Sequence, residues 1–263
     1  MIALTQGTAP SSQFRASAPG RAPVTTISLL GGFSISVDGR PVAGLPSGSQ
    51  RLLVFLALHE DAVSRTAVAG TMWPEATAQH ANDSLRSALS RLDALTRDGI
   101  LLASSELGFG VTVINDYDDA RALALRLLDS DTPIFDGDLA STAIATLSRE
   151  LLPDWSDDWI LSESDDWRHL RARALEALAL RLLRAGRAAE AEGAARAAIR
   201  VDPLRETPYA ALIRIHIADG NQSDAIRTFE DYRELLRSAL DIEPTRQLSD
   251  LVLAMNGNES ARR

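Results

Sequence analysis

The hydrophobic pattern of the first 75 residues predicts short strands followed by two helices. Residues 27–37 mix β-branched, apolar and small side chains in partial alternation, and Asp38-Gly39 after them is typical of a tight hairpin. The run 49–59 is apolar enough for a buried helix, which the cluster 47–49 (Ser-Gly-Ser) could cap. A second helix is expected to begin after Ser64 and to stop before Pro74.

Residues 78–96 carry apolar side chains at every third or fourth position, which predicts an amphipathic helix. Its apolar face consists of Ala81, Leu85, Ala88, Leu89, Leu92 and Leu95. Two β-prone runs follow, at 100–103 and 109–114, and the polar and glycine residues between them predict a hairpin. Strands, three helices and a closing hairpin within about 90 residues indicate a winged helix-turn-helix over residues 24–114.

From residue 115 the strand signals end and a helical Ala/Leu/Arg/Glu pattern takes over. Gly186 and Ala191 recur 34 residues later as Gly220 and Ala225. This period is that of tetratricopeptide repeats, in which glycine closes the turn between two helices and alanine allows them to approach. The predicted fold class is therefore mainly α with a small β component: a winged helix-turn-helix followed by a tetratricopeptide-like α-helical repeat domain over residues 115–254.

The two ends of the chain are expected to be flexible tails. Residues 1–23 are rich in Ser, Ala, Gly and Pro and lack the continuous apolar run of a signal peptide. Residues 255–263 form the second predicted tail. No stretch of 18 apolar residues occurs, so we expect no membrane span and a cytoplasmic location.

The composition argues against an enzyme. The chain has no lysine, which excludes a Walker A loop and a Schiff-base lysine, and no cysteine, which excludes thiolate chemistry. No two of the four histidines lie four residues apart to offer a metal-binding pair, and the paired acids, such as Asp157 and Asp158, are adjacent and do not face each other on a helix. We expect no metal and no cofactor.

The net charge of −9 does not by itself indicate a nucleic-acid partner. The winged-helix segment 24–114 contains six arginines and eight acids. Binding to DNA would therefore depend on where the arginines lie, and not on overall charge.

Specific motifs resemble a known family of regulators. The segments LLPDWSDDW (151–159), RVDPLRETPYAAL (200–212), ADGNQSDAIRTFEDYRELL (218–236) and LDIEPTRQLSDL (240–251) resemble the bacterial transcriptional activation domain. SLRSALSRL (84–92) resembles the recognition helix of an OmpR-type winged helix. In this order and at this length, the chain resembles the Streptomyces antibiotic regulatory protein (SARP) family over about 85–90% of its length.

The resemblance implies a transcriptional activator that binds promoter direct repeats, self-associates on them and recruits RNA polymerase. Two departures remove positive charge from the expected DNA face: Asp93 replaces a residue that is commonly basic, and Gly110 replaces the arginine of the family's wing motif. A protein-interaction adaptor with a degenerate winged helix is therefore the alternative function.

If the helix 78–96 enters a major groove, its polar face contacts DNA. Arg86 is the candidate for reading guanine, because a guanidinium pairs bidentately with its O6 and N7 atoms. Arg51, Arg91 and Arg97 are candidates for phosphate contacts, and Phe109 for contact by the wing. The full set of DNA-binding candidates is Arg51, Asn82, Ser84, Arg86, Ser87, Ser90, Arg91, Arg97 and Phe109. The alternative is that Arg86 and Arg91 are solvated surface residues of the helix, paired with Asp83 or Asp93.

A stacked helical repeat offers a concave surface to protein partners. The candidates for partner contact are Trp155, Trp159, Arg205, Tyr209 and Arg233. The alternative for the two tryptophans is packing between the repeats and the winged helix, and for Tyr209 packing between helices.

Overall fold

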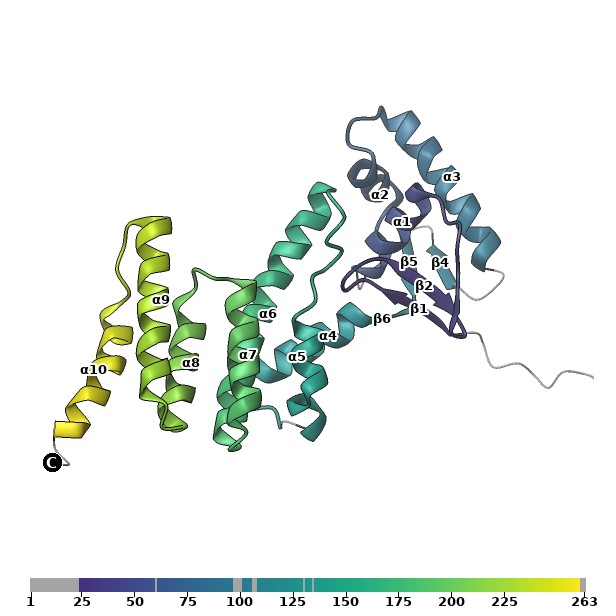
Figure 1. Cartoon of the computed structure of the whole chain (residues 1–263). Coiled ribbons are helices and arrows are strands. Elements are labelled where there is room, and N and C mark those ends of the chain that lie inside the picture. The colour runs from purple at the N-terminus through teal and green to yellow at the C-terminus, as the bar shows by residue number, and fades with distance from the viewer. Residues whose placement is uncertain are drawn as a thin grey trace, which may run out of the picture.

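The computed structural model consists of a small α/β unit joined to an array of helices (Figure 1). It describes residues 24–59, 61–96, 101–105, 108–129, 131–133 and 135–260, with the backbone alone at 93–96, 101–105, 108–112 and 255–260. The predicted tail 1–23 lies outside the described residues. Within them, no helix is long and apolar enough to cross a membrane.

A four-stranded sheet begins the α/β unit, in the order β3-β2-β1-β6. Its strands are β1 (Thr25–Ser28), β2 (Ser34–Val37), β3 (Arg40–Pro41) and β6 (Ile114–Asn115). The predicted hairpin at Asp38-Gly39 is confirmed: both residues have positive φ, 48° and 76°, and Val37 pairs with Arg40. Such a turn suits Asp and Gly because both tolerate left-handed backbone.

Three helices and a second hairpin complete the winged helix. They are α1 (Ser47–Ala57), α2 (Arg65–Met72), α3 (Ala78–Thr96), β4 (Leu101–Ser105) and β5 (Gly108–Thr112). Ser64 caps α2 as predicted, by accepting a bond from the Ala67 amide. The cap predicted for α1 is wrong: the N-cap is Pro46, which has no side-chain acceptor, and Ser49 lies inside the helix.

The helical array starts with α4 (Asp116–Leu128), the short 3-10 helix η1 (Asp136–Leu139) and α5 (Ser141–Leu147). Two helix pairs follow: α6 (Asp158–Arg184) with α7 (Ala188–Val201), and α8 (Glu206–Ala218) with α9 (Gln222–Leu240). The predicted repeat is confirmed, because Gly186 and Gly220 close the two turns at φ 74° and 75°. Ala191 and Ala225, which follow them, are fully buried between the paired helices.

A last helix, α10 (Arg246–Ser260), packs against α8 and α9 at the end of the array. The boundary predicted at residue 254 falls inside α10, which continues to Ser260, and residues 261–263 lie outside the described residues. Residues 256–260 (Asn-Gly-Asn-Glu-Ser) extend a helix whose buried apolar residues, Leu248 and Val252, lie earlier in it.

The winged helix and the array share one hydrophobic core, which runs from β1 through α1 and α3 into α4, α6 and α7. Backbone hydrogen bonds also join them: the Gly31 amide donates to the Glu150 carbonyl at 2.6 Å, and the Leu152 amide donates to the Leu29 carbonyl at 3.0 Å. The segment before α6 is thus hydrogen-bonded to the residues that directly follow β1. The two parts are packed together and are not separated by a free linker.

Candidate nucleic-acid interface

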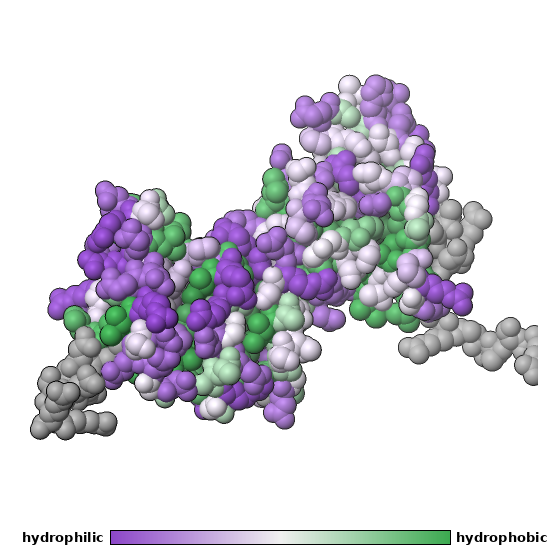
Figure 2. Space-filling view, in the orientation of Figure 1, coloured by the Kyte–Doolittle hydropathy of each residue, from purple (hydrophilic) through white to green (hydrophobic). Residues whose placement is uncertain are grey.

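Helix α3 buries its apolar face and presents its polar face to solvent. Ala81, Leu85, Ala88, Leu89 and Leu92 are buried. Five DNA-contact candidates on the opposite face are exposed: Asn82, Arg86, Ser87, Ser90 and Arg91. A sixth candidate, Ser84, is partly exposed. In Figure 1, α3 lies on the side of the winged helix away from α7 to α10, and Figure 2 shows a mostly hydrophilic surface there.

Arg86 is an exposed cation on this face. Its side chain is 74% exposed and forms an ion pair of 2.9 Å with Asp83, one turn earlier, which is 53% exposed. Exposed pairs of this kind contribute at most about 1 kcal/mol, since water competes for both groups. The guanidinium can therefore leave Asp83 for a stronger acceptor at little cost.

A buried contact fixes α3 against α1. The Ser49 hydroxyl donates to the Ala88 carbonyl at 3.1 Å, and Ser49 is 1% exposed. Beside this contact lies a shallow hollow of about 380 Å³ between the start of α1, Trp73 and α3. Ser84, Ser87 and Arg91 line it. Trp73 and Gly48 are further lining residues that we did not anticipate, because their proximity to α3 depends on how three helices pack.

Arg51, predicted to contact a DNA phosphate, is bound to groups of the protein itself. Its guanidinium donates to the Met72 carbonyl at 2.9 Å and forms an ion pair with Asp157, just before α6. Both side chains are about three-quarters buried, at 25% and 22% exposed. We therefore withdraw Arg51 as a phosphate contact. No local sequence signal pairs Asp157 with a residue 106 positions earlier.

The wing is described by its backbone only. β4 and β5 form an antiparallel hairpin in which Phe109 is opposite Ser104. The strands place Phe109 and Gly110 in the wing as predicted, whereas Arg97 lies outside the described residues. The roles suggested for Arg97 and Phe109 remain predictions.

Both tryptophans proposed as partner anchors pack between the winged helix and the array. Trp159 meets Phe55 of α1 edge-on, with ring centroids 5.2 Å apart. Trp155 packs against Phe33 at 6.0 Å, and both indoles are partly exposed. Packing between the repeats and the winged helix therefore accounts for Trp159, and we withdraw this residue as an anchor for a partner protein. Trp155 also lines a surface groove.

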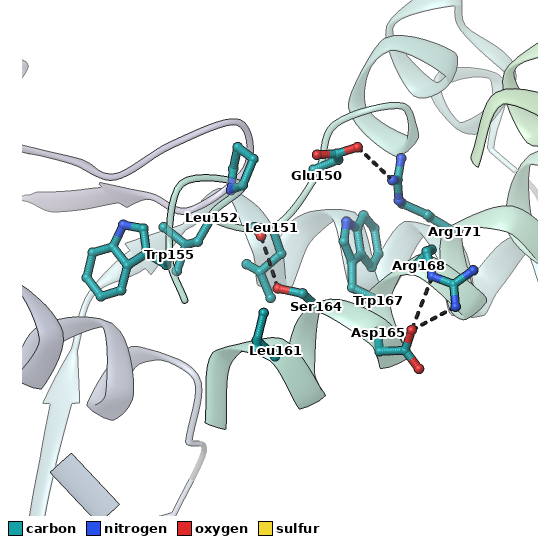
Figure 3. Close-up of a pocket in the computed structure, with 11 residues that line it drawn as sticks. Glu150, Leu151, Leu152, Trp155, Leu161, Ser164, Asp165, Trp167, Arg168 and Arg171 are labelled. Carbon is teal, nitrogen blue, oxygen red and sulfur yellow. Dashed lines mark hydrogen bonds and ion pairs between the residues drawn. The ribbon is translucent and has the colours of Figure 1, made fainter. Parts of the chain in front are cut away.

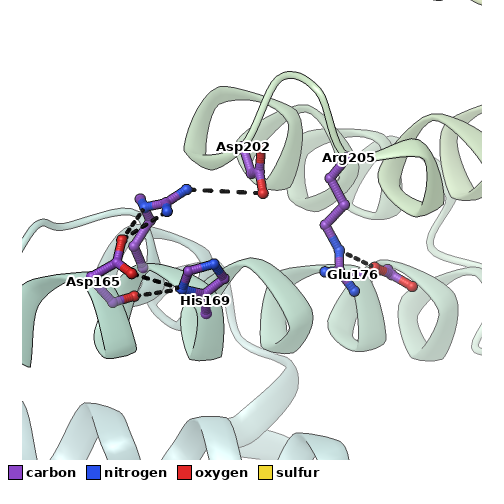
Figure 4. A network of polar contacts seen from close by, with 6 residues as sticks. Asp165, His169, Glu176, Asp202 and Arg205 are labelled. Atoms are coloured by element: carbon purple, nitrogen blue, oxygen red, sulfur yellow. Dashed lines mark hydrogen bonds and ion pairs between the residues drawn. The ribbon is translucent and has the colours of Figure 1, made fainter. Parts of the chain in front are cut away.

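The other three partner candidates form contacts within the array. Tyr209 is 8% exposed and stacks on Tyr232 with ring centroids 4.2 Å apart, so we withdraw it as a surface contact. Arg205 reaches back to Glu176 of α6 at 3.5 Å, within the polar network of Figure 4. Arg233 pairs with Glu243 at 2.7 Å. These two arginines hold successive elements of the array together.

Asp116, at the start of α4, is a connecting residue that the sequence did not indicate. Its carboxylate accepts hydrogen bonds from the amides of Leu29 and Leu30, at 2.6 and 3.2 Å, and pairs with Arg149 at 3.2 Å. It therefore ties the end of β1, the start of α4 and the segment before α6 to one another.

Among the described residues, no group of three or more His, Asp or Glu side chains could hold a metal ion. The arrangement is instead that of a helix with a polar, exposed face on a rigid support. A winged helix-turn-helix joined to a tetratricopeptide-like array defines a class of transcription regulators, and comparison with known proteins gives the family.

The model of the bacterial transcriptional activator domain matches residues 114–255, more than half of the chain. The chain belongs to this family of transcription regulators. No curated protein matches it.

The fold is also found in a solved structure, "Mycobacterium tuberculosis EmbR in complex with low affinity phosphopeptide". The TM-score is 0.69 at 21% sequence identity, over 90% of this chain and 66% of that chain. This chain therefore spans slightly less than two thirds of that relative. At this level of identity the likeness supports the fold, and the phosphopeptide is a partner of that protein.

Proposed function

We propose that this protein is a SARP-type activator that binds promoter DNA through α3 and recruits RNA polymerase through its helical array. The observation that carries the proposal is the free polar face of α3. Its serines are short enough for close approach to base edges, Arg86 projects into solvent, and no part of the described array covers it. Docking on a major groove therefore needs no rearrangement of the two units.

In this arrangement Arg86 reads a base and Arg91 contacts a phosphate. The guanidinium of Arg86 exchanges Asp83 for the O6 and N7 atoms of a guanine, and it keeps its charge satisfied throughout. Arg91 lies on the same exposed face of α3, and its proposed role is to bind a backbone phosphate and so to position the helix in the groove.

Replacing Arg86 by alanine tests this function. We expect Arg86→Ala to weaken binding to the cognate operator by about 1–3 kcal/mol and to relax the preference at one base pair. The measurement is a gel-shift titration with footprinting on the promoters of neighbouring genes. Arg227→Ala is the matched control, because Arg227 is 70% exposed and pairs with Asp224 at i,i+3 spacing, as Arg86 does with Asp83. Equal affinity of the two variants would contradict base reading by Arg86.

Few cations face the DNA, so counterion release contributes little to affinity and a single copy should bind weakly. Two copies on adjacent direct repeats would restore affinity through effective concentration. A shallow salt dependence on one half-site and cooperative occupancy of two would fit this proposal.

The second candidate is an adaptor whose winged helix no longer binds DNA. The acidic residues on or near the same face, Asp83 and Asp93, favour it, as does Gly110 in the wing. If the unmodified protein shifts no promoter fragment even at low salt, the adaptor is the better description.

A further inference from the structure

The carboxylate of Asp83 lies in the middle of the exposed face of α3. Residues three and four positions apart are neighbours on a helix, and the four such neighbours of Asp83 are all exposed: Gln79, His80, Arg86 and Ser87. The side chain of Asp83 is itself 53% exposed and pairs with Arg86, with Asp83 Oδ1 and Arg86 Nη1 2.9 Å apart. A duplex that docks on this face therefore meets an acidic group beside the arginine.

The stability of α3 does not account for an acid at this position. Asp83 lies beyond the first turn of the helix, which begins at Ala78, so it neither caps the helix nor lies at the positive end of its dipole. Aspartate is a poor residue for a helix interior, and an exposed ion pair with Arg86 adds little stability. The carboxylate also repels the phosphates of a bound duplex. Its position suits a role in which the DNA itself supplies a hydrogen-bond donor.

Reading of guanine by Arg86 leaves Asp83 without its partner. When the guanidinium turns to the O6 and N7 atoms of guanine, the carboxylate faces the groove, where a charge without a hydrogen bond is costly. The base edges of the major groove offer two donors, the N4 amino group of cytosine and the N6 amino group of adenine. Adenine carries the N7 acceptor beside its amino group, and this acceptor repels a carboxylate. Cytosine is therefore the base that satisfies Asp83 best.

The amino group of the cytosine paired with this guanine lies next to the atoms that Arg86 contacts. Its N4 atom donates to the guanine O6 atom across the base pair, so these two atoms are about 2.9 Å apart. Asp83 Oδ1 and Arg86 Nη1 are also 2.9 Å apart. The two side chains thus present an acceptor and a donor at the spacing at which the C·G pair presents N4 and O6. One base pair can then be read through both of its bases.

We propose that Asp83 is a specificity-determining residue, which accepts a hydrogen bond from the N4 amino group of the cytosine paired with the guanine that Arg86 reads. The inference rests on the proposed function and gives the operator a required C·G base pair. When the guanine is replaced by adenine or cytosine, Asp83 faces the O4 atom of thymine or the O6 atom of guanine and is repelled. The acid thus lowers affinity for incorrect sites, which is one way to gain specificity.

The test begins with an operator that the wild-type protein selects from a pool of random duplexes. The guanine read by Arg86 is the base whose preference is relaxed in Arg86→Ala. The cytosine opposite that guanine is then replaced by N4-methylcytosine, whose methyl group takes the place of the amino hydrogen that faces the major groove, while base pairing is kept. The contact with Arg86 is retained, so the methylated operator isolates the hydrogen bond proposed for Asp83.

Wild type, Asp83→Ala and Asp165→Ala are compared by gel-shift titration on the two operators and on random-sequence DNA. Asp165→Ala is the matched control, because Asp165 of α6 is 57% exposed and pairs with an arginine three residues later, Arg168 (Figure 3), as Asp83 pairs with Arg86. Each variant removes one exposed carboxylate, so both change the net charge equally. Circular dichroism verifies that each is folded.

We expect N4-methylation to weaken binding by the wild type and by Asp165→Ala about tenfold, and binding by Asp83→Ala less than about twofold. Asp83→Ala should bind random-sequence DNA at least as tightly as the wild type, because a charge that repels phosphates is lost. Its preference for the selected operator over random-sequence DNA should fall about tenfold, whereas that of Asp165→Ala should be unchanged.

Three results would overturn the proposal and leave DNA binding by α3 intact. They are a wild type that is insensitive to the methyl group, equal weakening of the wild type and Asp83→Ala by it, and an Asp83→Ala variant that gains affinity for all DNA without losing its preference. The last would show that Asp83 only repels the duplex. A selected operator in which Arg86→Ala relaxes no guanine would contradict both base contacts. A wild type that selects no sequence and shifts no duplex is a different result, which removes the proposed function and the role of Asp83 with it.

Discussion

At the scale of single residues, burial and partners decide which polar side chains are available for recognition. Arg86 and Arg51 look alike in the sequence, yet Arg86 is solvent-exposed and Arg51 is engaged with Met72 and Asp157. The same contrast separates Trp155, which lines a groove, from Tyr209, which is enclosed by its stacking on Tyr232. The chemistry of a residue type predicts its potential contacts, and the surroundings determine which contacts form.

Tyr232 provides a pH test at this scale. Burial raises the pKa of its phenol from 10.0 to about 12, with Glu206 adding to the shift, and its hydroxyl donates to the Leu204 carbonyl at 3.0 Å. Because the folded pKa lies above the unfolded value, the stabilisation is complete below pH 10 and is lost as the pH rises toward 12.

In Tyr232→Phe, we expect the free energy of unfolding to fall by about 1 kcal/mol at neutral pH, through loss of the hydrogen bond. It should then decline less steeply than in the wild type between pH 10 and 12. Denaturant unfolding at a series of pH values measures both effects. Parallel declines in the two proteins would show that the phenol of Tyr232 is not protected from ionisation.

At the scale of elements, the repeat signature depends on backbone conformation. Gly186 and Gly220 occupy equivalent turns with φ near +75°, and each turn reverses the chain between two packed helices. The buried alanines after each glycine bring the paired helices close together. Small residues at a fixed spacing of 34 positions therefore specify the turns and the close packing of the two helix pairs.

Gly220→Ala tests the turn. A Cβ atom at this position would meet nothing within 4 Å, so any loss of stability comes from the left-handed backbone. We expect the free energy of unfolding to decrease by about 1 kcal/mol. Gly70→Ala is the control of opposite sign: Gly70 is an exposed residue inside α2 with equally open space, and alanine there should stabilise by about 0.5–1 kcal/mol. Thermal denaturation of both variants is sufficient, and a stabilised Gly220→Ala would refute the argument.

At the scale of the whole molecule, the orientation of the array relative to α3 is held by contacts across the domain junction. α1 packs against α3 through Ser49 and against the start of α6 through Arg51 and Phe55. Asp116 and Arg149 hold the other side of the junction. The shared core and these polar contacts together hold the array against the winged helix.

A double-mutant cycle on Arg51 and Asp157 tests this coupling. We expect Arg51→Ala and Asp157→Ala to be non-additive, with an interaction energy of roughly 0.5–3 kcal/mol, because both side chains are mostly buried between the units. The same cycle on Arg196 and Glu192, an exposed pair within α7, should give about 0.3–0.5 kcal/mol. Denaturant unfolding of the six variants and the wild type supplies the energies, and additivity at Arg51 and Asp157 would show that the junction is loosely held.

Much of the fold was predictable because its signals are local. Helix α3 begins and ends where the apolar period does, and the Asp38-Gly39 turn and the glycine-alanine repeat each follow from a few neighbouring residues. The exposed face of α3 was predictable for the same reason, since burial of one face of an amphipathic helix leaves the other in solvent.

The sequence by itself determined the order of elements, the polar face of α3 and the repeated helix pairs, because residues three, four or 34 positions apart set these features. Only the tertiary structure decided that Arg51 pairs with Asp157, that Asp116 joins the ends of distant elements, and that Trp159 packs against Phe55. These contacts join residues up to 106 positions apart, and their geometry comes from packing the whole chain around one core.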